Sequence, residues 1–130
     1  MKKSKRCNNH YILIVVAVAI AVGVYFFTGA DDVSTGGEFD EFAQCLTDSG
    51  AKMYGAYWCG HCKNQKKAFG DSFQYVDYTE CDAQGEGGDP SACQAAGITG
   101  YPTWVFADGE SAGGNRPFEF LSEKTGCALH

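Results

Sequence analysis

The chain has 130 residues, with 16 acidic and 10 basic side chains and seven cysteines, a length that fits one domain and a separate N-terminal segment. All the acidic residues lie in 31–130, which carries only six of the basic ones and no basic stripe. The charge therefore argues against nucleic acid as a partner.

The first thirty residues differ from the rest of the chain. Residues 1–10 hold four Lys and Arg and no acid, and 11–28 carry no charge. A helix of that length spans about 27 Å, close to the bilayer core of about 30 Å. We expect a cytoplasmic flank at 1–10 and a single-pass anchor in the cell membrane at 11–30, with the C-terminal domain periplasmic or extracellular. A cleaved signal peptide with small residues at 28–30 is the alternative.

A linker is expected at 31–37 and a domain at 38–130. Thr35 and Glu38 have the spacing of a capping box ahead of the first helix. Residues 39–46 carry apolar side chains at helical spacing, which predicts an amphipathic helix that stops at Gly50.

The remaining domain sequence alternates strand and helix signals. Glycines mark the expected helix ends at 70, 97 and 126, and Asp108-Gly109 is a hairpin turn signal. Asp89-Pro90 reads as an N-cap followed by proline at the first helical position. The later helices are predicted at 59–69, 90–96 and 117–125, and the strands at 52–58, 73–80, 103–107 and after 109. This order predicts an α/β fold with a central mixed sheet and helices on both faces.

Cys59 and Cys62 are the cysteines most indicative of function. Zinc would need a second such pair, and a c-type haem would need a histidine where Lys63 stands, so we expect no metal and no cofactor. A purely structural bond would close almost no loop. At a helix N-terminus, unpaired N–H groups and the helix dipole favour a thiolate. We expect Cys59 to be the nucleophile, Cys62 the resolving thiol, and protonated His61 a stabiliser of the thiolate.

The sequence WCGHC at 58–62, with Gly-Tyr-Pro-Thr at 100–103, resembles the thioredoxin superfamily, and CGHC resembles protein disulfide isomerases. The stretches GAKMYGAYWCGHCKNQK, CQAAGITGYPTWVF and LSEKTGC are similar to the thioredoxin-like domain fused to or partnered with vitamin K epoxide reductase homologues. The resemblance covers most of 38–127. It implies a thioredoxin-like fold and a membrane-anchored thiol-disulfide oxidoreductase acting on protein thiols and disulfides.

The resemblance also implies a substrate groove at Trp58, Gly100, Tyr101 and Pro102, with a cis bond before the proline. From the sequence alone, that proline could equally be an ordinary trans turn residue. A quinone-coupled membrane oxidase of the epoxide-reductase type is the implied partner. The family places a buried carboxylate six residues before the first cysteine, where this chain has Met53, so water or another group must exchange protons with the resolving thiol.

Six cysteines outside the N-terminal segment allow fifteen pairings. A Cys81–Cys93 bond would close about thirteen residues and stabilise by roughly 3 kcal/mol, and the resemblance agrees with this pair. Cys45 and Cys127 would then pair by elimination. Free buried thiols, an intermolecular bond, or a pair that relays electrons to the redox cysteines are the alternatives.

Two other functions stay open. The domain could be a peptide-binding or chaperone module in which Cys59–Cys62 is a permanent disulfide. It could also be a reductase fed by a membrane electron importer.

Overall fold

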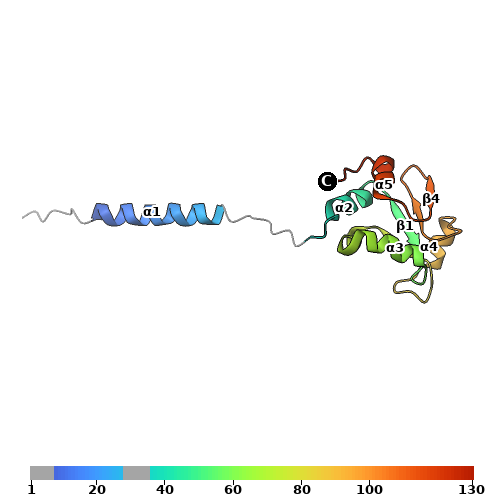
Figure 1. Cartoon of the computed structure of the whole chain (residues 1–130). Coiled ribbons are helices and arrows are strands. Elements are labelled where there is room, and N and C mark those ends of the chain that lie inside the picture. Colours follow the sequence, from blue (N-terminus) through green and yellow to red (C-terminus); the bar gives the residue numbers. More distant parts are fainter. Residues whose placement is uncertain (1–7, 28–35) are drawn as a thin grey trace, which may run out of the picture. The chain divides into compact units, whose positions relative to one another are not determined.

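The computed structural model describes residues 8–27 and 36–130 (Figure 1). The chain divides into two compact units, Met1–Thr35 and Gly36–His130. The predictions for the basic flank up to residue 7, the cleavage site at 28–30, and the linker and capping residue up to Thr35 lie outside the described residues.

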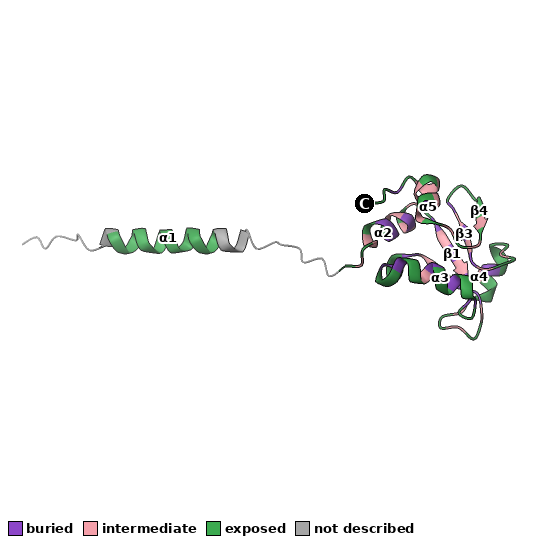
Figure 2. Ribbon diagram, in the orientation of Figure 1, coloured by how far each residue is buried: buried purple, intermediate pink, exposed green. Residues whose placement is uncertain are grey.

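The described residues of the N-terminal unit form the 20-residue helix α1 (Asn8–Phe27). Its side chains are exposed from His10 to Gly23 (Figure 2). Within the part of the chain that the structure describes, no helix combines the length and the apolar character needed to cross a membrane. The predicted transmembrane anchor is therefore not confirmed.

The second unit is built on a four-stranded mixed sheet in the order β2-β1-β3-β4. β1 pairs in parallel with β2 and antiparallel with β3, and β3 pairs antiparallel with β4. The predicted mixed sheet with a closing antiparallel hairpin is confirmed, and its combination with the helices is a thioredoxin-like fold. The strands are β1 (Lys52–Gly55), β2 (Tyr78–Glu80), β3 (Thr103–Val105) and β4 (Ser111–Gly113).

The four helices predicted in this unit are confirmed. Each is followed by a glycine with positive φ, at 50, 70, 97 and 126, as the sequence predicts. Asp89 caps α4 by accepting the N–H of Ala92 at 3.0 Å. The helices are α2 (Asp40–Asp48), α3 (Gly60–Phe69), α4 (Pro90–Ala95) and α5 (Phe118–Thr125).

One core joins the sheet to the helices. The fully buried Met53 and Trp104 are register partners on β1 and β3. They belong to the same buried cluster as Leu46 of α2, Phe69 of α3 and Leu121 of α5. This packing holds the start of α3 at the end of β1, where the paired cysteines lie.

The prediction of a strand over 73–80 is wrong for its first half. Residues Gly70–Tyr75 form a 3-10 helix, η1, and only Tyr78–Glu80 is strand. The apolar residues resemble a strand pattern, but tertiary contacts decide their conformation. Ser72 is fully buried, and its Oγ accepts the N–H of Phe39 at 3.0 Å, which ties η1 to the start of α2.

The first predicted strand is also shorter than the 52–58 expected. Ala56 begins a turn, in which its carbonyl accepts the N–H of Cys59 at 3.0 Å. The N–H of Tyr57 is bound by a side chain, Glu80 Oε1 at 3.1 Å, rather than by a neighbouring strand. Leaving the sheet at this point brings the chain to the N-terminus of α3.

Two disulfides link distant parts of the domain. Cys45 of α2 is bonded to Cys127 after α5, and Cys81 after β2 is bonded to Cys93 of α4. These are the pairings considered from the sequence. Within the described residues, the unbonded cysteines are Cys59 and Cys62.

Candidate active site

Cys59 is the N-cap residue of α3. Its backbone is extended, with φ −73° and ψ 119°, and its carbonyl accepts the N–H of Lys63 at 3.1 Å to start the helix. The side chain therefore stands at the N-terminal end of the helix, where backbone N–H groups lack helical partners. Only 8% of Cys59 is exposed, and its Sγ lies 3.6 Å from the carbonyl oxygen of Tyr101.

Cys62 lies one turn further along α3 and is fully buried. Burial raises the pKa of its thiol from 9.0 to about 12, and the neighbouring Cys59 adds to this rise, while Lys66 and a backbone hydrogen bond from Ala56 oppose it. The space around the sulfur is tight, because a Cβ added to Gly55 would lie 2.9 Å from Cys62 Sγ. Cys62 is therefore shielded from large molecules and holds its proton strongly.

The Tyr101–Pro102 peptide bond is cis, as the resemblance implies. Tyr101 and Trp58 flank Cys59, with their rings edge to face and centroids 6.1 Å apart. Trp58 is 55% exposed, and its indole N–H donates to Asp82 Oδ2 at 2.7 Å. These contacts form an aromatic rim beside the more exposed cysteine.

Two further predicted site residues, His61 and Gly100, lie at the edge of the site around Cys59. His61 is exposed on the first turn of α3. Gly100 is exposed ahead of the cis proline, and its carbonyl accepts the Thr103 hydroxyl at 2.7 Å. The structure thus brings Trp58 and Tyr101 against Cys59, while Gly100 shapes the loop before the proline.

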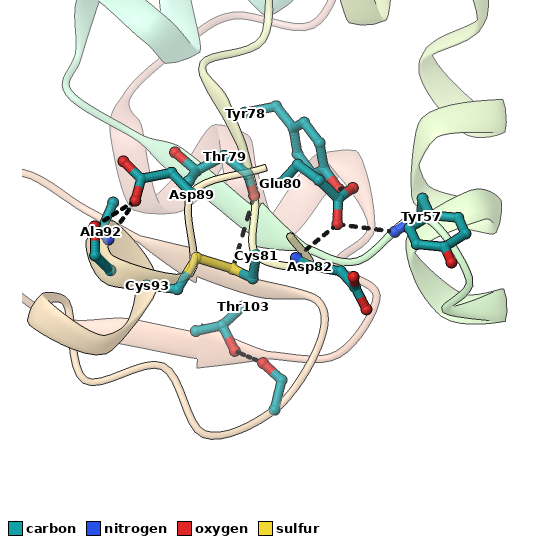
Figure 3. Close-up of a disulfide and its surroundings, with 12 residues drawn as sticks. Tyr57, Tyr78, Thr79, Glu80, Cys81, Asp82, Asp89, Ala92, Cys93 and Thr103 are labelled. Carbon is teal, nitrogen blue, oxygen red and sulfur yellow. Dashed lines mark hydrogen bonds between the residues drawn. A yellow bond between two sulfur atoms is a disulfide. The ribbon is translucent and has the colours of Figure 1, made fainter. Parts of the chain in front are cut away.

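Sequence reasoning missed a buried carboxylate, Glu80, at the end of β2. Glu80 is 6% exposed and is the register partner of Gly55. Its Oε1 accepts the N–H groups of Tyr57 at 3.1 Å and Asp82 at 3.0 Å (Figure 3). Its Oε2 accepts the hydroxyl of Tyr78 at 2.8 Å. Strand alternation could have found it, because Glu80 follows Tyr78 by two positions and so faces the same side of the sheet.

Lys66, itself half-buried, lies beside the half-buried Tyr78 and the buried Glu80. Its Nζ lies 3.7 Å from the centroid of the Tyr78 ring. Burial lowers the pKa of Lys66, while attraction to Glu80 and Cys62 opposes the shift. Burial and the hydrogen bond to Glu80 raise the pKa of Tyr78. Lys66 and Tyr78 are thus electrostatically coupled both to Glu80 and to Cys62.

The donor set does not suggest a metal centre. Within the described ranges, 8–27 and 36–130, no group of three or more His, Cys, Asp or Glu side chains could hold a metal ion.

A thioredoxin-like fold with a C-x-x-C pair at a helix N-terminus, beside a cis proline, defines a class of redox proteins. No protein-family model matches the chain. It is similar to "Thiol-disulfide oxidoreductase LTO1" of Arabidopsis thaliana, with 41% identity over 91 residues. The match covers 67% of this chain and only 24% of LTO1, so the chain spans about a quarter of that relative. Fold, site and similarity together support a thioredoxin-like redox family.

Proposed function

We propose that this chain is a thiol-disulfide oxidoreductase that acts on protein thiols and disulfides through Cys59 and Cys62. The observation that carries the proposal is the unequal placement of the two sulfurs. Cys59 caps α3 beside the cis-proline loop and keeps 8% of its surface exposed, whereas Cys62, one turn behind it, has none. The name of LTO1 supports the same reaction type.

The proposed reaction proceeds by two thiol exchanges. The Cys59 thiolate attacks a substrate disulfide, one substrate sulfur leaves as a thiolate, and a mixed disulfide forms. Cys62 then attacks Cys59 Sγ, which forms the Cys59–Cys62 disulfide and releases the second substrate thiolate. Oxidation of a substrate runs in the opposite direction. Cys59 receives the substrate in both directions, because it is the more exposed sulfur and stands among the free N–H groups of α3.

The loop before the cis proline is proposed as the place where a polypeptide substrate binds. Trp58, Gly100, Tyr101 and Pro102 would form the groove beside Cys59. A hollow of about 420 Å³, lined in part by Ile98, shares Tyr101 with this groove and offers room for a substrate side chain. An exposed aromatic rim around a reactive sulfur suits an unfolded segment more than a small thiol.

Trapping tests the proposed function. Cys62→Ala removes the resolving thiol, so mixed disulfides between Cys59 and a reduced, unfolded test protein treated with a mild oxidant should accumulate. Cys59→Ala/Cys62→Ala is the matched control and should trap nothing. No trapped species with Cys62→Ala, together with an unreactive Cys59, would instead favour a peptide-binding module with a structural disulfide. Non-reducing electrophoresis followed by mass spectrometry measures both results.

We propose the oxidising direction, with a quinone-coupled membrane oxidase of the epoxide-reductase type as the partner. The CGHC sequence supports it, because a histidine between the two cysteines can stabilise the thiolate of the reduced pair and so make the disulfide the stronger oxidant. Equilibration with glutathione buffers should give a reduction potential near about −180 mV, and a value near about −270 mV would indicate a reductase instead. His61→Ala should move the potential towards more negative values.

We also propose that the N-terminal unit holds the domain at the cell membrane, outside the cytoplasm. The exposed apolar side chains of α1, such as Leu13, Ile14 and Val18, support this proposal. Two disulfides in the C-terminal unit suit an oxidising compartment. The full chain should sediment with membranes after a carbonate wash, and a 36–130 fragment should not. Recovery of the full chain in the soluble fraction would refute the attachment.

A further inference from the structure

We infer that Glu80, acting through the Tyr78 hydroxyl, accepts the proton of Cys62 when Cys62 attacks the mixed disulfide. This inference rests on the proposed function, and it concerns the second exchange alone. The thioredoxin superfamily that the chain resembles places a buried carboxylate six residues before the first cysteine, where this chain has the fully buried Met53. The position that would exchange protons with the resolving thiol is therefore apolar here.

Cys62 needs a proton acceptor because its thiol is shielded from solvent and protonated. A thiol with a pKa of about 12 is ionised in only about one molecule in 10⁵ at pH 7, and only a thiolate attacks a disulfide. Bulk water does not reach a sulfur with 0% exposure directly. A group inside the domain is needed to take the proton.

The Tyr78 hydroxyl bonds to Glu80 and also borders the space beside Gly55 that Cys62 Sγ borders. A Cβ placed on Gly55 would lie 2.9 Å from Cys62 Sγ and 3.2 Å from the Tyr78 hydroxyl oxygen. The sulfur and the hydroxyl therefore border the same small space, which Gly55 leaves open because it has no side chain. From the other side, the hydroxyl donates to Glu80 Oε2 at 2.8 Å.

Hydrogen bonds fix the direction of the carboxylate. Glu80 Oε1 is held by the N–H groups of Tyr57 and Asp82, which leaves Oε2 for Tyr78 (Figure 3). Lys66 reaches over the Tyr78 ring from α3 and attracts both Glu80 and Cys62. The carboxylate of Asp82 is engaged elsewhere, with the Trp58 indole and the N–H of Gln84.

The proton and electron balance of the step is complete. The Cys62 proton passes to the Tyr78 oxygen as the Tyr78 hydroxyl proton passes to Glu80 Oε2. The Cys62 thiolate then forms a bond to Cys59 Sγ and breaks the bond between Cys59 and the substrate, whose sulfur leaves as a thiolate. The cysteine pair is oxidised by two electrons and the substrate is reduced by two. In the reverse direction, Glu80 returns the proton to Cys62 through the same hydroxyl.

Glu80 could serve as the proton acceptor or could only hold the local structure in place. The variant Glu80→Gln distinguishes these two roles. The amide oxygen of glutamine can still accept the two backbone N–H groups, and its NH₂ can donate to Tyr78, so the local hydrogen bonds are kept while the proton acceptor is lost. Glu86→Gln is the matched control, since it removes the same charge from an exposed position in the adjoining loop.

The experiment follows the two exchanges of the reduced full chain with a disulfide-linked dimer of a fluorescent peptide. The first peptide is released by Cys59 and the second by Cys62. In Glu80→Gln, the second release should slow about tenfold or more at pH 7 and recover as the pH rises, while the first stays within about twofold of wild type. Glu86→Gln should leave both phases unchanged.

Tyr78→Phe keeps the carboxylate but interrupts the transfer, so it should also slow the second release. A second release with wild-type rate and pH dependence in folded Glu80→Gln, or in Tyr78→Phe if Glu80→Gln does not fold, overturns the inference. Failure of the wild-type chain to release any peptide refutes the proposed function instead, which keeps the two failures distinct.

Discussion

The buried thiol of Cys62 should make the stability of the domain fall at high pH. Its pKa in the folded domain is about 12, against an ordinary value of 9.0. As the pH rises past 9, the unfolded chain loses this proton before the folded chain does. Stability from the neutral buried thiol is therefore fully present below pH 9 and is lost between pH 9 and 12. The slope approaches about 1.4 kcal/mol per pH unit, which gives a loss of about 1.3 kcal/mol between pH 8 and 10.

Two serine variants isolate this effect. Cys59→Ser leaves Cys62 with no partner in the pair, so no reductant is needed, and Cys59→Ser/Cys62→Ser removes the titrating group. The difference between their free energies of unfolding in urea cancels other titrations, including those of Tyr78 and Lys66. Desolvation is the largest cause of the raised Cys62 pKa, and it survives the loss of Cys59. Between pH 8 and 10, the free energy of unfolding should therefore fall by about 1 kcal/mol more in the single variant than in the double variant.

An equal fall in the free energy of unfolding of the two variants between pH 8 and 10 would refute this reasoning. It would mean that Cys62 ionises as easily in the folded domain as in the unfolded chain, so that its burial does not control its proton. The need for an internal proton acceptor would then disappear as well. Circular dichroism at each pH, before urea is added, checks that both variants start from the same fold.

The two disulfides should differ in the stability they supply. Replacing both cysteines by alanine at Cys45–Cys127, 82 residues apart, should cost about 4.5 kcal/mol, against about 3 kcal/mol for Cys81–Cys93, 12 residues apart, because the longer loop constrains the unfolded chain more. Equal or reversed losses in urea unfolding would contradict the loop argument. Gln65→Ala should cost about 2 kcal/mol, since the buried amide both donates to and accepts from the backbone ahead of α5. A loss below about 0.5 kcal/mol would show that those backbone groups find other partners.

The parts of the fold that local chemistry determines could be predicted from the sequence. Helix ends depend on the residue itself, and Gly70 or Gly126 adopts positive φ at little cost. The Asp89-Pro90 pair acts within one turn of α4. The position of Cys59 at the tip of α3 followed from the same local reasoning.

The parts of the fold that depend on contacts between distant residues could not be predicted from the sequence. Ser72 is part of a 3-10 helix because its hydroxyl binds the N–H of Phe39, 33 residues earlier. Tyr57 leaves β1 because its N–H reaches Glu80, 23 residues later. A pattern read over a few residues contains neither partner, so the strands were predicted too long. Glu80 itself was missed although its alternation with Tyr78 on β2 is a local signal.

The family that this domain resembles has an acid at the position of Met53. The parallel pairing of β1 and β2 explains how a carboxylate elsewhere could take the proton of Cys62 instead. Met53 is the register partner of Tyr78, and Gly55 is the register partner of Glu80. Residues two apart on a strand face the same side, so Tyr78 and Glu80 lie next to the buried positions of β1. A carboxylate moved to β2 can therefore serve the same sulfur, provided that the end of β1 is small. Gly55 meets that condition, because any side chain there would press on Cys62 Sγ and on the Tyr78 ring. Apolar Met53, small Gly55 and acidic Glu80 then form one set, and Gly55→Ala should disturb the second exchange as Glu80→Gln does.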